Sequence, residues 1–160
     1  SSHLSGELFK MMTGLDMVHV PYRGTPPAFA DMIAGRIQVM FSTVPTALEH
    51  IRAGTLRALA TTAATRLEVL PDIPTVGEFV PGYESSAWWG VGAPAKTPAE
   101  IVGKLNKEIN AGLTDPAMNA RLADLGGTPL TGSPAEFGRL IGEETEKWGK
   151  VAKFAGLKPE

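Results

Sequence analysis

The sequence contains no cysteine among its 160 residues, which excludes disulfide bonds, thiolate metal sites and a cysteine nucleophile. It also lacks any apolar run approaching the ~20 residues that a membrane-spanning helix needs. Its 15 basic and 17 acidic residues give a formal net charge of −2, and no basic stripe or basic amphipathic face is present. These absences predict a globular protein with no nucleic-acid partner and no direct insertion into a membrane.

Metal and phosphate motifs are also missing. The three histidines, His3, His19 and His50, are too scattered to indicate a metal site, and no glycine pattern forms a phosphate-binding loop. We therefore expect neither a metal nor a cofactor. The chain opens on two serines where a helix is already beginning, rather than on methionine, so we expect it to be part of a longer or processed chain.

The first 62 residues alternate helical patterns with short apolar strands. Helices are predicted from residue 2 to Gly14, from a Thr25 cap to Gly35, and from residue 45 or 46 to Gly54. Strands are predicted at residues 17–20, 37–41 and 56–61. Strands that recur with a helix between them must be parallel. The pattern therefore predicts a parallel βαβαβ lobe, and residues 1–85 are interpreted as a complete ligand-binding lobe.

The remainder of the chain has a different character. Residues 63–85 read as a long connection with one short helix near 76–79, followed by a strand at 86–91 and a doubtful one at 128–130. Capping boxes at 97–100 and 133–136, and an Asp-Pro pair at 115–116, each predict a helix start. The last helix is predicted over 134–155.

Three amphipathic helices with one good strand need a sheet to cover. Most of that sheet is absent from this sequence. We therefore interpret residues 86–160 as the carboxyl-terminal part of a second lobe whose amino-terminal strands lie upstream. Apolar helix faces left uncovered in this way predict self-association of the chain, including by exchange of elements with a second copy.

The hexapeptide HVPYRG at residues 19–24 is the most informative stretch for function. It places Tyr22, Arg23 and Gly24 at the carboxyl end of a strand, against the helix that begins at Thr25. Small ligands bind at this position in open α/β sheets, and the positive end of the helix dipole favours an anion. Other candidates follow the same logic at helix starts and strand ends. The full set of predicted ligand-binding residues is Ser1, Ser2, His3, Tyr22, Arg23, Gly24, Thr25, Ser42, Thr43 and Trp89.

Each candidate also has a purely structural explanation. Ser2 can be an ordinary helix cap, Arg23 a surface arginine, and Trp89 a packing residue. A serine, histidine and aspartate triad could be assembled from Ser42, His19 and Asp31, but no nucleophile elbow accompanies it. Binding of a small ligand is therefore preferred, an enzyme such as a hydrolase or decarboxylase is the alternative, and an interaction module is the third option.

Several short stretches, taken in order, resemble the substrate-binding receptors of tripartite tricarboxylate transporters, also called Bug-type receptors. The stretches that carry the resemblance are SHL at 2–4, GELF at 6–9, VPYRG at 20–24, IRAGTLRALA at 51–60, PDIPTV at 71–76, WG at 89–90, AP at 93–94 and GSPAEF at 132–137. Their order and spacing, which run through nearly the whole chain, are more specific than any one of them.

The resemblance implies an α/β, periplasmic-binding-protein-like fold: two lobes around a cleft, in a protein of roughly double this length. It implies a periplasmic receptor that binds a small carboxylate and delivers it to the subunits of a membrane transporter. It also implies that this chain lacks the amino-terminal part, including a ligand loop, and so binds ligand weakly. Ser42 and Thr43 stand where family members often have aspartate and asparagine, which argues against an amino-acid ligand but leaves donors for a carboxylate.

Overall fold

The computed structural model describes residues 2–157, which fall into two compact units. The first unit contains the residues up to 87 together with those from 148 onward, and the second unit contains residues 88–147. The lobes predicted from the sequence, 1–85 and 86–160, are lobes of a longer receptor. These two units do not test that division, which remains a prediction. Ser1, one of the candidate ligand residues, lies outside the described part of the chain. No helix within residues 2–157 is both long enough and apolar enough to cross a membrane.

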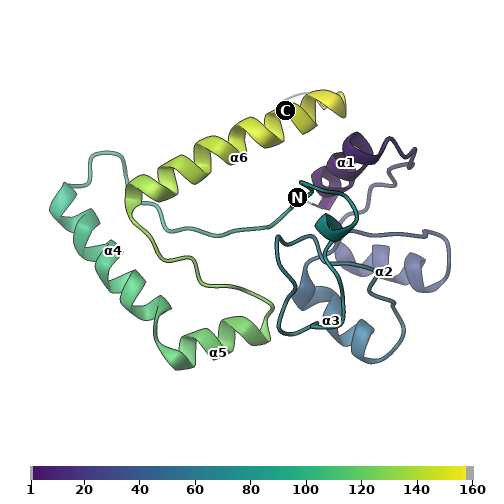
Figure 1. Ribbon diagram of the computed structural model, residues 1–160, viewed down its shortest axis with the longest axis horizontal. Coiled ribbons are helices and arrows are strands. Elements are labelled where there is room, and N and C mark those ends of the chain that lie inside the picture. Colours follow the sequence, from purple (N-terminus) through teal and green to yellow (C-terminus); the bar gives the residue numbers. More distant parts are fainter. Residues whose placement is uncertain (1, 158–160) are drawn as a thin grey trace. The chain divides into compact units, whose positions relative to one another are not determined.

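Three helices and one short turn of 3-10 helix build the amino-terminal part of the first unit (Figure 1). These are α1 (Ser2–Thr13), α2 (Thr25–Ile33), α3 (Val44–Arg52) and η1 (Val76–Glu78). The predicted glycine stops are confirmed: Gly14, Gly35 and Gly54 follow the three helices with φ of 70°, 73° and 71°. Only glycine adopts this left-handed conformation without strain.

The start of α2 differs from the prediction. Gly24 is the N-cap residue, with φ of 101°, and Thr25 is the first helical residue rather than the cap. No side chain caps this helix. Pro26 and Pro27 fill the next two positions, where a fixed φ suits the first turn and a missing N–H costs little.

The predicted strands are not formed within residues 2–157. The segments 17–20, 37–41, 56–61, 86–91 and 128–130 are irregular, and a single parallel bridge joins Thr61 to Thr75. Extended apolar sequence alone does not make a strand, because a strand exists only when its backbone pairs with a neighbour. Residue 61 finds such a neighbour in the long connection, through hydrogen bonds from Thr61 N to Pro74 O and from Val76 N to Thr61 O, both 2.8 Å.

The core of the first unit forms where α1, the end of the long connection and the end of α6 (Pro134–Phe154) meet. Leu8, Tyr83 and Val151 are buried together there. The Tyr83 hydroxyl donates to the Ser5 carbonyl at 3.0 Å, and the Ser5 and Ser85 hydroxyls lie 2.6 Å apart. These polar contacts attach the connection to α1 inside an otherwise apolar core, which satisfies groups that would be costly to bury alone.

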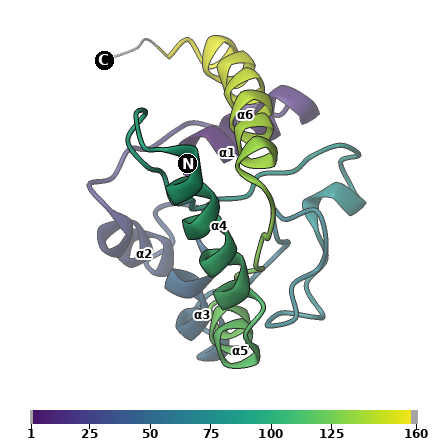
Figure 2. The ribbon, with the colours of Figure 1, turned by 90° about the vertical axis from the view of Figure 1, so that its left-hand side faces the viewer.

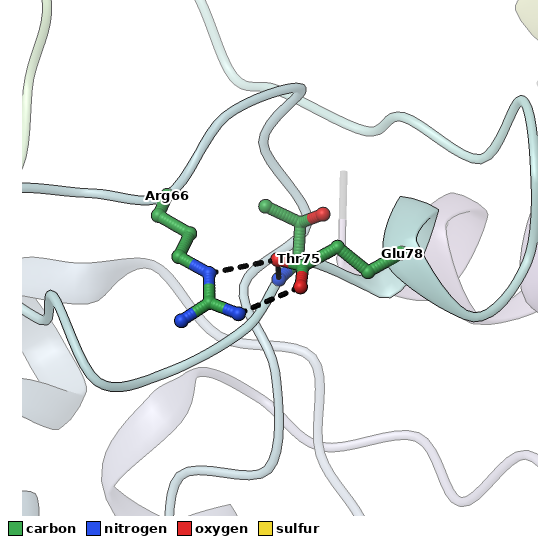
Figure 3. A network of polar contacts seen from close by, with 3 residues as sticks. All are labelled: Arg66, Thr75 and Glu78. Atoms are coloured by element: carbon green, nitrogen blue, oxygen red, sulfur yellow. Dashed lines mark hydrogen bonds and ion pairs between the residues drawn. The ribbon is translucent and has the colours of Figure 1, made fainter.

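A polar network closes the long connection on itself (Figure 3). The Arg66 guanidinium donates from Nε and Nη2 to the two Glu78 oxygens at 2.9 and 2.7 Å, and Thr75 N donates to Glu78 Oε1 at 2.9 Å. The Arg66 hydrogen bonds, helped by the Thr75 amide, lower the pKa of Glu78 to about 2. The network fixes the turn of η1 next to the bridged Thr75.

The second unit contains α4 (Ala99–Leu113), α5 (Pro116–Asp124) and the first part of α6; Figure 2 shows α4 running into α5 through a tight turn. Asn106 and Asn110 both donate to the Gly132 carbonyl, at 2.8 and 2.9 Å, and Gly132 N donates back to Asn110 Oδ1 at 3.1 Å. Two asparagines one helical turn apart thus hold the segment that leads into α6.

The predicted helix starts of this unit are confirmed in two of three cases. Ser133 and Glu136 form the reciprocal capping box, with Ser133 N donating to Glu136 Oε2 at 2.7 Å and Glu136 N donating to Ser133 Oγ at 3.2 Å. The Asp115 carboxylate accepts from Met118 N at 3.0 Å. The box predicted at 97–100 is wrong: α4 begins at Ala99 with Pro98 as N-cap, so Thr97 lies outside the helix.

The two tryptophans point different ways, as adjacent extended residues should. Trp88 packs edge to face on Phe137, with ring centroids 5.5 Å apart and planes at 88°. Trp89 is 85% exposed. Gly90 also lies directly against the Phe137 ring. A Cβ atom at Gly90 would be only 2.1 Å from Phe137 Cζ, so a side chain does not fit there unless the ring moves.

Candidate functional site

One cavity of the first unit collects half of the predicted ligand residues. Its volume is about 660 Å³, and it is lined by the start of α1, the residues on either side of α2 and the segment that leads toward α3. The predicted residues that line it are Ser2, His3, Tyr22, Gly24 and Thr25. They come from two separate stretches of chain, residues 2–3 and 22–25. The sequence predicted each stretch as a helix start, and the structure places both in the lining of one cavity.

The four other predicted residues within the described part of the chain do not line this cavity. Arg23 is exposed and makes no hydrogen bond or ion pair with residues 2–157. Ser42 and Thr43 direct their hydroxyls to Thr46 Oγ1, at 2.8 and 3.0 Å, at the start of α3. Trp89 belongs to the second unit.

Two helix amino termini reach the cavity, those of α1 at Ser2 and of α2 at Thr25. Backbone N–H groups in a first helical turn have no partner within the helix and favour an anion. In α2 the second and third positions are prolines, which carry no N–H. The donors at this end are therefore few, chiefly the amides of Gly24 and Thr25 and the Thr25 hydroxyl. Gly24 has no side chain that could compete with a ligand for them.

Tyr22 forms a wall of the cavity, but its hydroxyl is already used. It donates to Asp31 Oδ2 at 2.8 Å, while Arg36 Nη1 donates to Asp31 Oδ1 at 2.7 Å. Hydrogen bonds from Arg36 and then from Tyr22 lower the pKa of Asp31, and the bond to Asp31 raises the pKa of Tyr22. Because an ionised carboxylate only accepts, Tyr22 has no proton left to donate to a ligand carboxylate.

A charged group lies in the cavity wall on α1. Glu7 is only 5% exposed, and its Oε1 lies 3.1 Å from Lys10 Nζ and 3.6 Å from His3 Nε2. These partners come from the neighbouring turns of the same helix, at the spacing where side chains meet. A buried carboxylate that is paired in this way does not present a bare negative charge to an anionic ligand.

Two histidines stack within the same cavity. The rings of His3 and His19 have centroids 3.7 Å apart and planes within 7° of parallel. Burial, and then the neighbouring His3, lower the pKa of His19. His19 is therefore neutral near pH 7 and acts as part of an aromatic wall.

Sequence reasoning missed several residues of this cavity, among them Glu7, Lys10 and Arg36. Glu7 and Lys10 could have been found, because they follow His3 at helical spacings of four and seven on one face. Arg36 gave no such signal, since it lies beyond the end of α2 and its position depends on Asp31. Arg36, and not the predicted Arg23, is the arginine that lines the cavity, and its guanidinium is paired with Asp31.

The chemistry available here is noncovalent binding by amides, hydroxyls and cationic side chains. The hypothetical triad is not assembled, because Asp31 is bonded to Tyr22 and Arg36, Ser42 to Thr46, and His19 is stacked on His3. Within residues 2–157, no three histidine or acidic side chains are grouped closely enough to hold a metal ion.

Comparison with known proteins gives a consistent result. The chain matches the family model of the tripartite tricarboxylate transporter family receptor over residues 1–157. It is 35% identical over 158 residues to Protein BugT of Bordetella pertussis, covering 98% of this chain and 48% of that protein. The chain spans about half the length of most of the curated relatives that it matches.

Solved structures agree with this match. A protein of R. palustris solved with adipate is 41% identical with a TM-score of 0.84, over 99% of this chain and 54% of that one. MatC from Rhodopseudomonas palustris, solved with bound malate, is 32% identical with a TM-score of 0.75, over 94% of this chain and 52% of that one. The α/β, periplasmic-binding-protein-like fold class predicted from the sequence is thus confirmed. The matched family is one of receptors, not enzymes, and the periplasmic binding protein BugD is also among the solved structures that the chain resembles. The chain belongs to the tripartite tricarboxylate transporter receptor family.

Proposed function

We propose that this chain forms part of a periplasmic receptor that binds a small organic acid and delivers it to a membrane transporter. The observation that carries the proposal is the convergence of the α1 and α2 amino termini on one cavity, in a member of this receptor family. Dicarboxylates are the favoured ligands, since the neighbours solved with adipate and with malate hold acids of this class.

The residues of the cavity make different kinds of contact with the proposed ligand. The first amides of α1, the Ser2 hydroxyl and the Gly24 and Thr25 amides hold one carboxylate by hydrogen bonds to a charged acceptor. Arg36 also lies in the wall, where its guanidinium is paired with Asp31 at 2.7 Å. Tyr22 contributes its ring as a surface, since its hydroxyl is engaged with Asp31.

Arg23, Ser42, Thr43 and Trp89 remain proposed ligand residues of the complete receptor. Arg23 is exposed and without a polar partner among residues 2–157, so it is available to a ligand that reaches across a cleft. The hydroxyls of Ser42 and Thr43 surround Thr46 at a third helix start. Ser1, proposed on the same grounds as Ser2, lies outside the described residues.

The test is a thermal-shift screen of the receptor at its natural length against adipate, malate and an aromatic acid, with product analysis of each mixture. We expect at least one acid to raise the melting temperature without being consumed, since a ligand that binds only the folded state stabilises it. Consumption of the stabilising acid would support an enzyme instead, and no shift with any carboxylate would contradict the proposal.

A matched pair of serine variants sharpens the test. Ser2→Ala removes a hydroxyl from the cavity, and Ser86→Ala removes one that only meets Glu84 on the surface, at 3.5 Å. Loss of one hydrogen bond to a charged group costs about 1.5–3 kcal/mol, so Ser2→Ala should weaken acid binding roughly tenfold or more. Ser86→Ala should leave the affinity unchanged, and equal effects of the two variants would remove Ser2 from the proposed site.

A further inference from the structure

The rings of His3 and His19 form a pair that reaches the cavity from two separate parts of the chain. His3 lies in the first turn of α1, and His19 lies in the segment between α1 and α2. Their ring centroids are 3.7 Å apart, their planes are within 7° of parallel, and both residues line the cavity. His3 is half-buried and His19 is exposed, so a small molecule in the cavity can reach the pair.

The ionised side chains of the cavity lining balance one another. Besides the histidines, the charged or titratable side chains that line the cavity are Glu7 and Lys10 on α1, Asp16 in the segment of His19, and Tyr22 and Arg36 on either side of α2. Glu7 Oε1 lies 3.1 Å from Lys10 Nζ and 3.6 Å from His3 Nε2, and Arg36 is paired with Asp31. With both histidines neutral, the described lining therefore offers no surplus of positive charge to an anion that carries two negative charges.

The histidine pair is the part of this lining whose charge changes near neutral pH. Burial, and then the neighbouring His3, lower the pKa of His19, so this ring is neutral near pH 7 when no anion is beside it. Two stacked rings do not readily carry a proton each, because like charges at this distance repel. A carboxylate beside the pair has the opposite effect, since a nearby opposite charge favours the protonated form. The pair is therefore suited to gain one proton when an anion arrives.

Protonation also changes which hydrogen bonds the rings can make. A neutral imidazole has one N–H donor and one acceptor nitrogen, whereas an imidazolium has two donors and no acceptor. His3 directs Nε2 toward Glu7 Oε1, so a neutral ring with its proton on Nε2 leaves Nδ1 as an acceptor, which repels a carboxylate. Addition of a proton turns Nδ1 into a donor that attracts one.

We propose that the His3–His19 pair gains one proton from solvent when a dicarboxylate binds in this cavity, and that the resulting imidazolium holds the second carboxylate of the ligand. The inference rests on the proposed function, in which the starts of α1 and α2 hold the first carboxylate. The proton forms an N–H bond at the ring nitrogen that was an acceptor, while both ligand carboxylates stay ionised. When the ligand leaves, the proton returns to solvent.

Calorimetry of the natural-length receptor counts this proton. Malate and adipate are each titrated into the receptor at pH 6.5 in two buffers of different ionisation enthalpy, because the difference in observed heat gives the number of protons taken up. We expect uptake of about 0.5–1 proton per bound acid, and an affinity roughly fivefold or more higher at pH 6 than at pH 8. An anion that raises the pKa of the pair binds more tightly below the raised pKa, and this advantage is lost as pH rises through it.

Two variants separate the histidines of the cavity from the histidine outside it. His3→Asn combined with His19→Phe removes both titrating rings and keeps a flat ring at position 19. His50→Asn is the matched control, since His50 packs on Phe29 with ring centroids 4.9 Å apart and does not line the cavity. We expect the double variant to take up no proton and to lose the rise in affinity at pH 6, whereas His50→Asn should behave as the unchanged receptor.

A measurement on the unchanged receptor covers the case in which the double variant does not fold. The ring C–H resonances of His3, His19 and His50 are followed by NMR from pH 5 to pH 8, with and without malate. We expect malate to raise the titration midpoint of the cavity pair and to leave that of His50 in place. Midpoints of the pair that do not move when malate binds would contradict the proposal.

The outcomes of calorimetry separate this inference from the proposed function. Binding of either acid without proton uptake would overturn the inference and leave the proposed function standing. Uptake that persists in the double variant would assign the proton to another group, such as Glu7, and would also overturn it. Absence of binding by both acids would contradict the proposed function, and this inference with it.

Discussion

The two units differ in what their helices have to pack against. In the first unit α1 buries Leu8 against Tyr83 and Val151, and two hydrogen bonds among hydroxyl and carbonyl groups form inside that core. In the second unit neither α4 nor α5 has a buried residue, and Ile101, Leu105 and Leu125 stay about half exposed. Local features hold the second unit together: the Asp115 cap, the Ser133 box and the two asparagines on Gly132. A core therefore stabilises one unit, and helix ends with short-range contacts stabilise the other.

The largest effect should come from removing core volume in the first unit. Leu8→Ala leaves a cavity among buried neighbours and should lower the free energy of unfolding by about 2–5 kcal/mol. Leu105→Ala, on the exposed face of α4, should change it by no more than about 0.5 kcal/mol. Urea unfolding followed by circular dichroism measures both. Similar losses would break the comparison, because they would mean that α4 has a core of its own.

The contact of Gly90 with Phe137 is the place where the second unit comes nearest to tight packing. Gly90→Ala puts a methyl group into the Phe137 ring and should destabilise this unit by about 1–3 kcal/mol. Gly92→Ala is the matched control, since nothing lies within 4 Å of the added carbon there. Fluorescence of Trp88, whose ring packs on Phe137, reports the change. A stable Gly90→Ala variant would show that the ring moves aside freely.

Tyr83 contributes both an apolar ring and a polar hydroxyl to the core of the first unit. Tyr83→Phe keeps the ring but removes the hydrogen bond from its hydroxyl to the Ser5 carbonyl, and should cost about 0.5–1.5 kcal/mol. Tyr22→Phe, which removes a hydroxyl near the surface, should cost less. Melting curves of the two variants decide the order, and a larger loss for Tyr22→Phe would contradict it.

Burial raises the pKa of Tyr83 to about 12, above the ordinary value of 10.0. Its contribution to stability is therefore complete below pH 10 and is lost as pH rises from 10 toward 12, where only the unfolded chain ionises readily. Ultraviolet titration of tyrosinate in Tyr22→Phe should show one late transition. A transition near pH 10 in the folded protein would contradict the burial.

The smallest effect is expected from the Arg66–Glu78 network, which lies at the surface. The lowered pKa of Glu78, about 2 against an ordinary 4.5, means that its contribution is present above pH 4.5 and is lost as pH falls toward 2. Melting temperatures of the natural chain and of Glu78→Gln should therefore differ slightly at pH 6 and converge near pH 2. A difference that persists at pH 2 would show that the side chain acts by shape and not by charge.

The sequence predicted local structure well and long-range structure poorly, and particular residues show why. The stops at Gly14, Gly35 and Gly54, the cap at Asp115 and the capping box at Ser133 depend on a few neighbouring residues, so they can be predicted from the local sequence. The strand at 37–41 could not be confirmed in this way, because pairing depends on a partner segment elsewhere in the protein.

In the candidate site, too, features set by neighbouring residues were predicted and features set by distant contacts were not. Ser2, Tyr22, Gly24 and Thr25 were predicted from helix starts and do line the cavity. The use of the Tyr22 hydroxyl by Asp31, and the place of Arg36, depend on side chains five to nine residues away and were not predicted. Position within an element was predictable, whereas the direction and partner of a polar group were not.

The most direct test of the account is a crystal structure of the natural-length receptor with a dicarboxylate that stabilises it. We predict a ligand carboxylate within hydrogen-bond distance of the backbone amides at the start of α1 and at Gly24 and Thr25. A ligand bound away from Ser2, Gly24 and Thr25 would contradict the assignment of this cavity as the binding site.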